Sequence, residues 1–386
     1  MGKTVSSDIL VAGAGPAGMI AALAFAEAGF SVTLAGPAAP SGDRRTTALM
    51  TPSMNFLNGL GLFEALAREA APLRAMRIVD GTTRLVRSPT VTFRASEIGE
   101  DAFGYNIPNE HLLRSLDTAV HVRGAIGRRE ALVSGYRLSD DAVEAQTEDG
   151  AITARLVVAA DGRSSPARRA AGIETHRRGH AQSALVLNFA HSREHGGIST
   201  EFHTETGPFT QVPLPGRRSS LVWVVRPEEA AVLLEMEAEA LSTRIEDRMQ
   251  SMLGKIEVEQ GRQVYPLSSA MPSRFAARRV ALVGEAAHVF PPIGAQGLNL
   301  GVRDIQDLVV IARASRDDPG APAALMRYDA RRRPDIMARS SAVSVLNHSL
   351  LTDFLPAQFM RSAGLGLLAG FPPVRGERDS SGHVLA

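Results

Sequence analysis

Three glycines near the N-terminus have the spacing of a turn that binds a diphosphate. Gly13, Gly15 and Gly18 follow residues 8–12, which predict a short buried strand, and precede an alanine-rich stretch that predicts a helix and then a second strand at 31–35. In such a turn the glycines allow a sharp bend, a close approach of a pyrophosphate and tight packing of the helix. The free N–H groups and the helix dipole favour an anion, so the pattern predicts a dinucleotide site.

The second predicted strand lacks the acidic residue that usually ends it and binds the ribose hydroxyls. That position holds Gly36. Two interpretations stay open at this point. The nucleotide is NADP, with Arg44 or Arg45 binding its additional phosphate, or it is FAD and the adenosine ribose lacks one contact, for which Asp43 is a candidate substitute.

Two later strands end in short motifs of the same kind. A predicted strand at 156–160 runs into Asp161-Gly162, and another at 280–283 runs into Gly284-Glu285. A proline-containing loop follows, and a glycine-spaced segment predicts a helix from about Gly297. Only the first of the three motifs is a complete dinucleotide fingerprint, so a separate nicotinamide domain is not expected.

With these motifs in order, the chain resembles the single-component FAD-dependent aromatic hydroxylases. Residues 43–49 resemble the D-x-R-x-x-A-L segment of one branch, the ubiquinone-biosynthesis hydroxylases of the UbiH and UbiF type. Residues 207–215, 292–299 and 328–333 also look like this branch, and the resemblance covers nearly the whole chain. It favours FAD as the nucleotide.

The resemblance implies an α/β fold: a Rossmann-like FAD-binding domain, an inserted antiparallel β-sheet substrate domain and a helical C-terminus. The expected bounds are 1–75, 105–178 and 268–345 for the flavin domain, 76–104 and 179–267 for the substrate domain, and 346–386 for the helical segment and tail. The strands of the inserted sheet are predicted at 184–190, 198–204, 209–212 and 221–225. The apolar C-terminal segment is interpreted as a helix pair on the core, or as a membrane contact or a tunnel for a polyprenyl tail.

The family's site residues carry over by motif. Those expected to contact FAD are Gly13, Gly15, Ala17, Gly18, Arg45, Asn109, Asp161, Gly162, Gly284, Glu285, Gly294 and Gln296. At the reacting side of the flavin, Pro292 is expected to stiffen the loop under the ring system, and Gly297, Leu298 and Asn299 are expected to offer backbone N–H groups to the charge that develops on reduction. Glu285 stands where the family has aspartate. Its side chain is one methylene longer, so either the loop adjusts or FAD binds more loosely.

The predicted sheet carries candidate substrate residues. Phe202, Phe209 and Trp223 are candidates to line an aromatic pocket, with ordinary sheet core as the alternative. A phenol substrate can require a base, for which Glu201 and His203 are the candidates, expected on opposite faces of one strand.

The resemblance also implies the reaction and its partners. NADH or NADPH, as a transient co-substrate, reduces FAD, and O2 supplies the oxygen atom that enters an aromatic ring. The cofactor carries the difficult chemistry, which explains why the sequence shows few catalytic side chains. The expected substrate is a polyprenylphenol or a smaller aromatic molecule. The expected location is cytoplasmic and peripheral to the inner membrane, with other ubiquinone-biosynthesis proteins as partners.

Composition and isolated motifs exclude several other classes. A net charge of +1 offers no general surface for nucleic acid, and residues 331–333, a run of arginines, are interpreted as a solvated helix end. Cysteine is absent, so no thiolate chemistry is available. Residues 191–195 match a zinc motif but are predicted to form a loop, and no metal site is expected. His288 is interpreted as structural.

Four alternative functions stay open. The first is a hydroxylase of a soluble aromatic compound in catabolism or secondary metabolism. A flavin halogenase lacks its usual W-x-W motif, because Trp223 is the only tryptophan. A flavin reductase of an isoprenoid double bond would not consume oxygen in step with product. A non-catalytic flavoprotein of a biosynthetic complex would hold FAD that no nicotinamide donor reduces.

Overall fold

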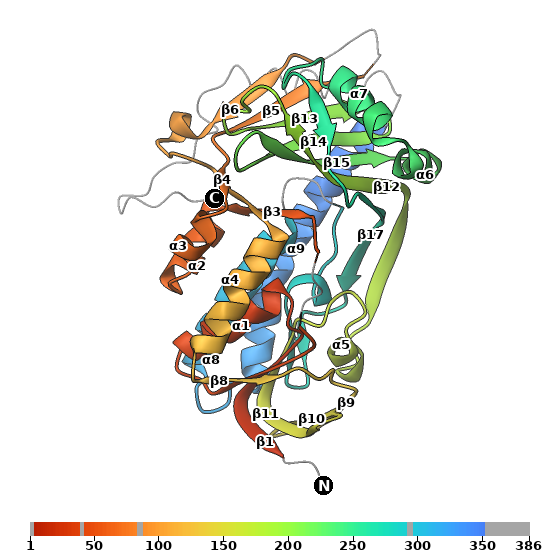
Figure 1. Ribbon diagram of the computed structural model, residues 1–386. Coiled ribbons are helices and arrows are strands. Elements are labelled where there is room, and N and C mark those ends of the chain that lie inside the picture. The colour runs from red at the N-terminus through yellow and green to blue at the C-terminus, as the bar shows by residue number, and fades with distance from the viewer. Residues whose placement is uncertain (1–3, 39–41, 83–87, 292–295, 352–386) are drawn as a thin grey trace. The chain divides into compact units, whose positions relative to one another are not determined.

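The computed structural model describes residues 4–38, 42–82, 88–291 and 296–351 (Figure 1). The chain divides into two compact units, and each consists of separate stretches of sequence. The first unit comprises Met1–Ala70, Ile107–His180 and Leu267–Ala342. The second comprises Ala71–Asn106, Ala181–Pro266 and the chain from Val343 onward. The expected domain bounds stay a prediction.

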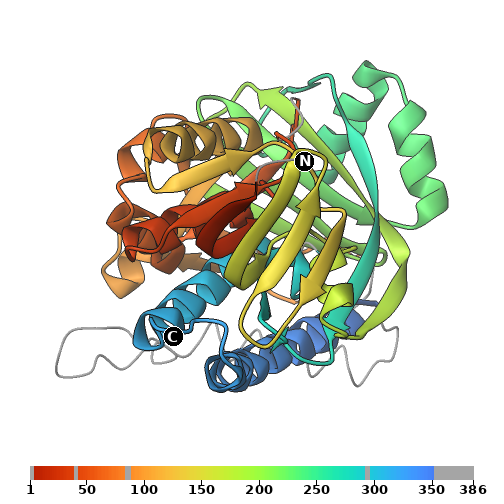
Figure 2. The same cartoon turned by 90° about the horizontal axis from the view of Figure 1, so that it is seen from below.

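The first unit is built on a parallel sheet whose strands come from distant parts of the sequence. Its parallel strands, in order across the sheet, are β19 (Val280–Leu282), β11 (Gly150–Ala159), β1 (Val5–Ala12), β2 (Val32–Ala35) and β8 (Ile126–Arg129). The strands predicted at the three motifs are therefore confirmed. β2, β19 and the last four residues of β1 and β11 are buried, as is expected where helices cover a parallel sheet. A hairpin of β9 (Gly135–Leu138) and β10 (Val143–Thr147) extends it antiparallel beside β11, in yellow in Figure 2.

Helix α1 (Pro16–Glu27) lies at the centre of this unit. Every residue from Gly18 to Phe25 is buried, because the helix packs on the sheet strands and on α4 (Asn109–Val122) and α8 (Gln296–Ala314). Its alanine-rich sequence lets the neighbouring elements approach closely. The unit also contains α2 (Thr51–Gly59), α3 (Phe63–Ala67), α5 (Pro166–Ala170) and the part of α9 (Pro322–Leu351) up to Ala342.

The arginine run lies inside α9 and not at its end, so the predicted helix end is wrong. The helix continues through Pro334 to Leu351. Arg332 is buried, with a side chain only 3% exposed, between two neighbours that remain accessible. A guanidinium group buried to this degree must be paired, and its partners are described with the site.

The second unit is a largely antiparallel sheet. Its strands, in order, are β16 (Ile256–Val258), β12 (Thr175–His191), β15 (Arg218–Val225), β14 (Gly207–Leu214), β13 (Ile198–Thr204), β5 (Ala75–Asp80) and β6 (Val91–Arg94), with β17 (Gln263–Pro272) beside β12. The four predicted strands are confirmed, but β12 is much longer than expected because its polar first half also forms strand. Short strands β3 (Thr46–Met50), β4 (Ala71–Pro72), β7 (Gly104–Pro108) and β18 (Ala276–Ala277) complete the fold.

Two helices, α6 (Pro227–Glu235) and α7 (Ala238–Arg248), cover one face of this second sheet. Leu185, Leu187 and Leu221 point from the strands into the same cluster as Leu233 and Ile245 of the helices. Because side chains alternate across a strand, the intervening residues lie on the other face, which these helices do not cover.

Candidate active site

The glycine turn after β1 has two glycines that are required by packing and one that faces open space. A Cβ on Gly13, whose φ is +106°, would lie 2.3 Å from the carbonyl oxygen of Ala160, and one on Gly18 would lie 1.8 Å from that of Gly13. A Cβ on Gly15 would meet nothing within 4 Å. Helix α1 begins at Pro16 without a side-chain cap or an acidic residue in its first turn. Its first amides are therefore available to an anion such as a diphosphate.

The first and third motifs meet at a close contact. Gly284 follows β19 with a φ of +60°, and a Cβ there would lie 3.0 Å from the Cβ of Ala17 in the first turn of α1. From the other side, a Cβ on Gly301 of α8 would lie 3.3 Å from the Cα of Gly284. Small residues at these three positions let the turn after β19 lie against both helices.

A buried carboxylate holds that turn in place. Asp304 of α8 is fully buried, and its Oδ2 accepts the N–H of Gly284 at 3.0 Å and lies 2.8 Å from Nε2 of His288. Its Oδ1 accepts the Nε–H of Arg332 at 2.8 Å. His288 is thus part of a structural network, and the carboxylate fixes the turn that contains the third motif.

Arg332 joins α8 to α9 at the centre of this network. Besides Asp304 it donates from Nη1 to Asp307 at 3.1 Å and to Asp335 at 3.0 Å. Burial opposes the charge, but the neighbouring carboxylates outweigh it, Asp304 most strongly, and raise the pKa of Arg332 above its ordinary value. The guanidinium therefore stays charged, and Asp307 and Asp335 each have a second arginine partner, Arg331 and Arg303 respectively.

Arg45 and Asn109, both expected to contact the cofactor, bind the same carboxylate, that of Asp43. Arg45 donates to Asp43 from Nε at 2.8 Å and from Nη2 at 2.7 Å. Asn109, at the start of α4, donates to the same carboxylate at 3.0 Å and accepts the hydroxyl of Thr47 at 2.6 Å. Burial would raise the pKa of Asp43, but these hydrogen bonds, that of Arg45 first, hold it below its usual value. Asp43 is therefore an ionised anchor for both residues.

The start of α8 is fixed by a side chain that the sequence places at the flavin. Asn299 accepts the N–H of Met50 at 2.9 Å and donates to the carbonyl of Ala48 at 2.7 Å, so its amide group binds the backbone of β3. Gly297 has open space where a side chain would be. Leu298 is half-buried, and Gln296 begins the helix.

Pro292 and Gly294 lie outside the described residues. Their roles at the flavin stay predictions.

The middle motif presents an incompletely bonded carboxylate. Oδ2 of Asp161 accepts the N–H of Ala167 at 3.0 Å, whereas its buried Oδ1 has no partner within the described part of the chain. Burial raises the pKa of this carboxyl above its ordinary value. Gly162 has a φ of +80° and open space beside it. Glu285 extends to Arg163 at 3.0 Å, and both side chains are about half exposed.

The three aromatic residues proposed to line a substrate pocket lie in the core instead. Phe202, Phe209 and Trp223 are 4%, 0% and 0% exposed, and successive ring centroids are 5.7 and 5.2 Å apart. They pack against α6 and α7, where Arg248 lies over the Trp223 ring at 5.1 Å. The pattern could not show which face the helices would cover, and the sheet-core interpretation is the correct one.

The two candidate bases share one face of their strand, so the expected opposite orientation is wrong. Glu201 and His203 are two residues apart, and the period of a strand places such residues on the same side. Oε1 of Glu201 is 2.9 Å from Nε2 of His203, and its Oε2 accepts the hydroxyl of Thr210 at 3.2 Å. Phe202 points to the opposite, helix-covered face. The dyad therefore lies on the face that α6 and α7 leave uncovered.

Residues 191–195 do not form a joint binding site. His191 ends β12, and its ring nitrogens contact Ser219 and the carbonyl of Arg193. His195 bonds to the carbonyl of Leu214.

In the part of the chain that the structure describes, no helix is long and apolar enough to cross a membrane.

Sequence reasoning missed the residues that hold the motifs in place. Asp304 and Arg332 are separated by 28 positions, and the resemblance of residues 328–333 to the family does not indicate the partner of Arg332. The available signal was the unusual placement of acidic residues in apolar helical stretches, which indicates paired burial. Arg128, at the end of β8, was also missed.

The residues present fit FAD. An open glycine at an uncapped helix start, an orphaned carboxylate oxygen beside it and an anchored Arg45 are the donors and acceptors that a flavin dinucleotide uses.

Comparisons with known proteins agree with this arrangement. The FAD binding domain family matches residues 6–341. Ubiquinone hydroxylase UbiL of Rhodospirillum rubrum is 34% identical over 380 residues, which cover 96% of this chain and 87% of that protein. The 3-demethoxyubiquinol 3-hydroxylase of Escherichia coli is 30% identical, with 93% of this chain and 94% of that protein covered.

A solved structure shows the same fold. The p-nitrophenol 4-monooxygenase PnpA of Pseudomonas putida superimposes with a TM-score of 0.78 at 19% identity, covering 97% of this chain and 96% of that chain. The family resemblance and the α/β fold predicted from the motifs are confirmed. The chain belongs to the FAD binding domain family, in the branch of the ubiquinone-biosynthesis hydroxylases, and is an FAD-dependent aromatic monooxygenase.

Proposed function

We propose that the protein hydroxylates the ring of a polyprenylphenol in ubiquinone biosynthesis, with NADH or NADPH as the transient reductant. The observation that carries this is the 34% identity with a ubiquinone hydroxylase over nearly the full length of this chain. The alternative is a smaller soluble aromatic substrate, and the fold shared with PnpA is compatible with either class. Contacts with a membrane and with other proteins of the pathway belong to this proposal, and the apolar residues that prompted them lie largely outside the described part of the chain.

Bound FAD supplies the redox chemistry, and the chain supplies position and charge. The amides of α1 that follow Gly15 would bind the diphosphate, and those of Gly297 and Leu298 would stabilise the negative charge that develops on the flavin. Asp304 keeps the turn at Gly284 in register with the start of α1. Each of these groups is fixed before the cofactor arrives, so little reorganisation is required.

The Glu201–His203 dyad is our candidate acceptor for the phenol proton. With Nε2–H donated to Glu201, the ring of His203 keeps Nδ1 as the acceptor. The side chains of His203 and Glu201 are only 6% and 20% exposed, so the carboxylate holds the imidazole ring in one orientation in a poorly solvated setting. A deprotonated phenol is a more electron-rich ring and a better target for hydroxylation.

Replacing His203 with glutamine is expected to lower kcat by about 100-fold at neutral pH, because a positioned base contributes roughly that factor. The loss should shrink as the pH approaches about 10, where phenols ionise without help. Product formation is measured across this pH range, with Thr210→Val as the control that touches the same carboxylate but removes no base. A loss that is equal at every pH would contradict the assignment.

The substrate class is tested with purified, FAD-loaded protein. NADH or NADPH is added under air with a polyprenylphenol in detergent, or with a soluble phenol in its place. We expect flavin reduction to accelerate with the polyprenylphenol, with O2 consumed in step with oxygenated product. Turnover with the soluble phenol alone would establish the alternative. Flavin that no donor reduces would favour a non-catalytic role.

A further inference from the structure

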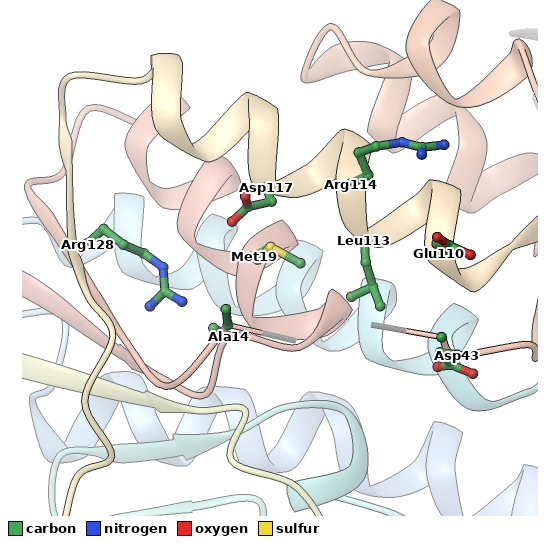
Figure 3. Close-up of a pocket in the computed structure, with 10 residues that line it drawn as sticks. Ala14, Met19, Asp43, Glu110, Leu113, Arg114, Asp117 and Arg128 are labelled. Carbon is green, nitrogen blue, oxygen red and sulfur yellow. The ribbon is translucent and has the colours of Figure 1, made fainter. Parts of the chain in front are cut away.

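A pocket of about 290 Å³ lies beside the glycine turn, within the first unit (Figure 3). Ala14, Met19 and Leu113 form its apolar part. Figure 3 shows Arg128 at one end and Asp43 at the other. The pocket opens at the carboxyl ends of β2 and β8, where nucleotides bind in sheets of this type.

The residue after β2 cannot be the usual carboxylate. Gly36 has a φ of +151°, and a Cβ there would lie 2.9 Å from the backbone nitrogen of Ala14 and 3.2 Å from the Cα of Gly13. A side chain at this position would therefore displace the glycine turn itself. The missing acid is a consequence of how closely the end of β2 lies against that turn.

A guanidinium group is fixed at the same strand ends. Nη1 of Arg128 donates to the carbonyls of Gly36 at 2.7 Å and Arg129 at 2.9 Å, and lies 3.4 Å from that of Leu34. Its Nε is buried and has no hydrogen-bond partner among the described residues. Backbone carbonyls at the ends of β2 and β8 hold the guanidinium in place. Its Nε–H still has no acceptor, and because buried donors are usually hydrogen-bonded, this indicates a missing ligand atom.

We propose that Arg128 recognises the adenosine half of FAD in place of the carboxylate at the end of β2. A carboxylate accepts the ribose hydroxyl protons, whereas a guanidinium donates to the hydroxyl oxygens or to the purine nitrogens and can stack on the ring. The protein would therefore donate hydrogen bonds to the adenosine where the usual carboxylate accepts them, at the same strand ends. This inference rests on FAD binding and not on the identity of the aromatic substrate.

The charges around the pocket favour an adenosine without an additional phosphate. Two arginines, Arg114 and Arg128, and three carboxylates, those of Asp43, Glu110 and Asp117, line the pocket, and Arg45 binds Asp43. With Arg45 counted the charges balance, so the pocket offers no excess of positive charge to bind a 2′-phosphate. The NADP interpretation of the missing acid is therefore disfavoured, and the pocket fits the ADP portion of FAD.

The test measures binding and does not require catalysis. FAD is titrated into apoprotein by flavin fluorescence, and ADP and 2′-phospho-ADP are titrated as competitors. Arg128→Met is expected to weaken FAD and ADP binding by a similar factor of about 10 to 100, as loss of charged hydrogen bonds implies. Wild-type protein is expected to prefer ADP to 2′-phospho-ADP. Gly36→Glu is expected to weaken FAD binding.

Arg137→Met, on the exposed hairpin of the same sheet, is the matched control and should bind FAD like wild type. Thermal melting of each apoprotein separates binding from folding, and Arg128→Lys keeps the charge if the methionine variant does not fold. Unchanged ADP affinity in a folded Arg128 variant would overturn the proposal. So would tighter binding by Gly36→Glu, or a preference of the wild type for 2′-phospho-ADP.

Discussion

Asp304→Asn is expected to lower the free energy of unfolding by about 3 kcal/mol, because it leaves a buried guanidinium without its fully buried partner. Asp304 is also the acceptor for His288 and for the N–H of Gly284. The turn beside α1 would loosen, so FAD affinity should fall as well. Urea denaturation of the apoprotein and a fluorescence titration with FAD measure the two effects.

Asp307→Asn is the matched control for that variant. Asp307 binds the same guanidinium group but has a side chain that is 15% exposed and does not touch the turn. We expect a loss of about 1 kcal/mol and little change in FAD affinity. If the two variants were equally destabilised and bound FAD equally, Asp304 would have no special part in holding the turn.

Gly15→Ala is expected to weaken FAD binding by at least about 30-fold while leaving the apoprotein as stable as wild type. The backbone at Gly15 has a φ of −75° and a ψ of −179°, which alanine adopts without strain. Its Cβ would meet no protein atom, so the space it enters is that of the diphosphate. Apoprotein melting and FAD titration test both halves of the prediction.

Gly18→Ala provides the contrast, because its Cβ would fall 1.8 Å from the carbonyl oxygen of Gly13. Here the turn must move, and both apoprotein stability and FAD affinity should fall. The outcome that would contradict the pair is a Gly15→Ala variant that binds FAD normally, since the diphosphate would then not lie on that turn.

The flavin-binding half of the fold could be predicted because its signals are local. The strand, glycine turn and helix at residues 8–28 are contiguous. Close backbone contacts at positions 13 and 18 leave no room for a Cβ, so glycine is required at both. The strands before Asp161 and Gly284 are apolar runs bounded by turn residues, which is the pattern of a buried parallel strand.

The parts that failed depend on contacts between distant segments. Arg332 was interpreted as solvated because neighbouring arginines usually are, and only the packing of α8 against α9 reveals its carboxylate partners. Alternation along β13 and β15 shows which residues share a face, but not which face α6 and α7 cover. Phe202 and Trp223 were therefore placed in a pocket when they belong to the core. The Glu201–His203 pair could have been found from the strand period alone.

The discontinuous first unit has a consequence for how the protein is made. The adjacent strands β1, β11 and β19 lie at the beginning, the middle and the last third of the chain, and α9 is needed to pair Asp304. A ribosome extends the chain from its N-terminus, so the glycine turn is synthesised long before the partners that complete its surroundings. The nascent polypeptide therefore cannot form the complete FAD site until α9 has emerged from the ribosome. FAD binding to the complete site should therefore follow the synthesis of α9.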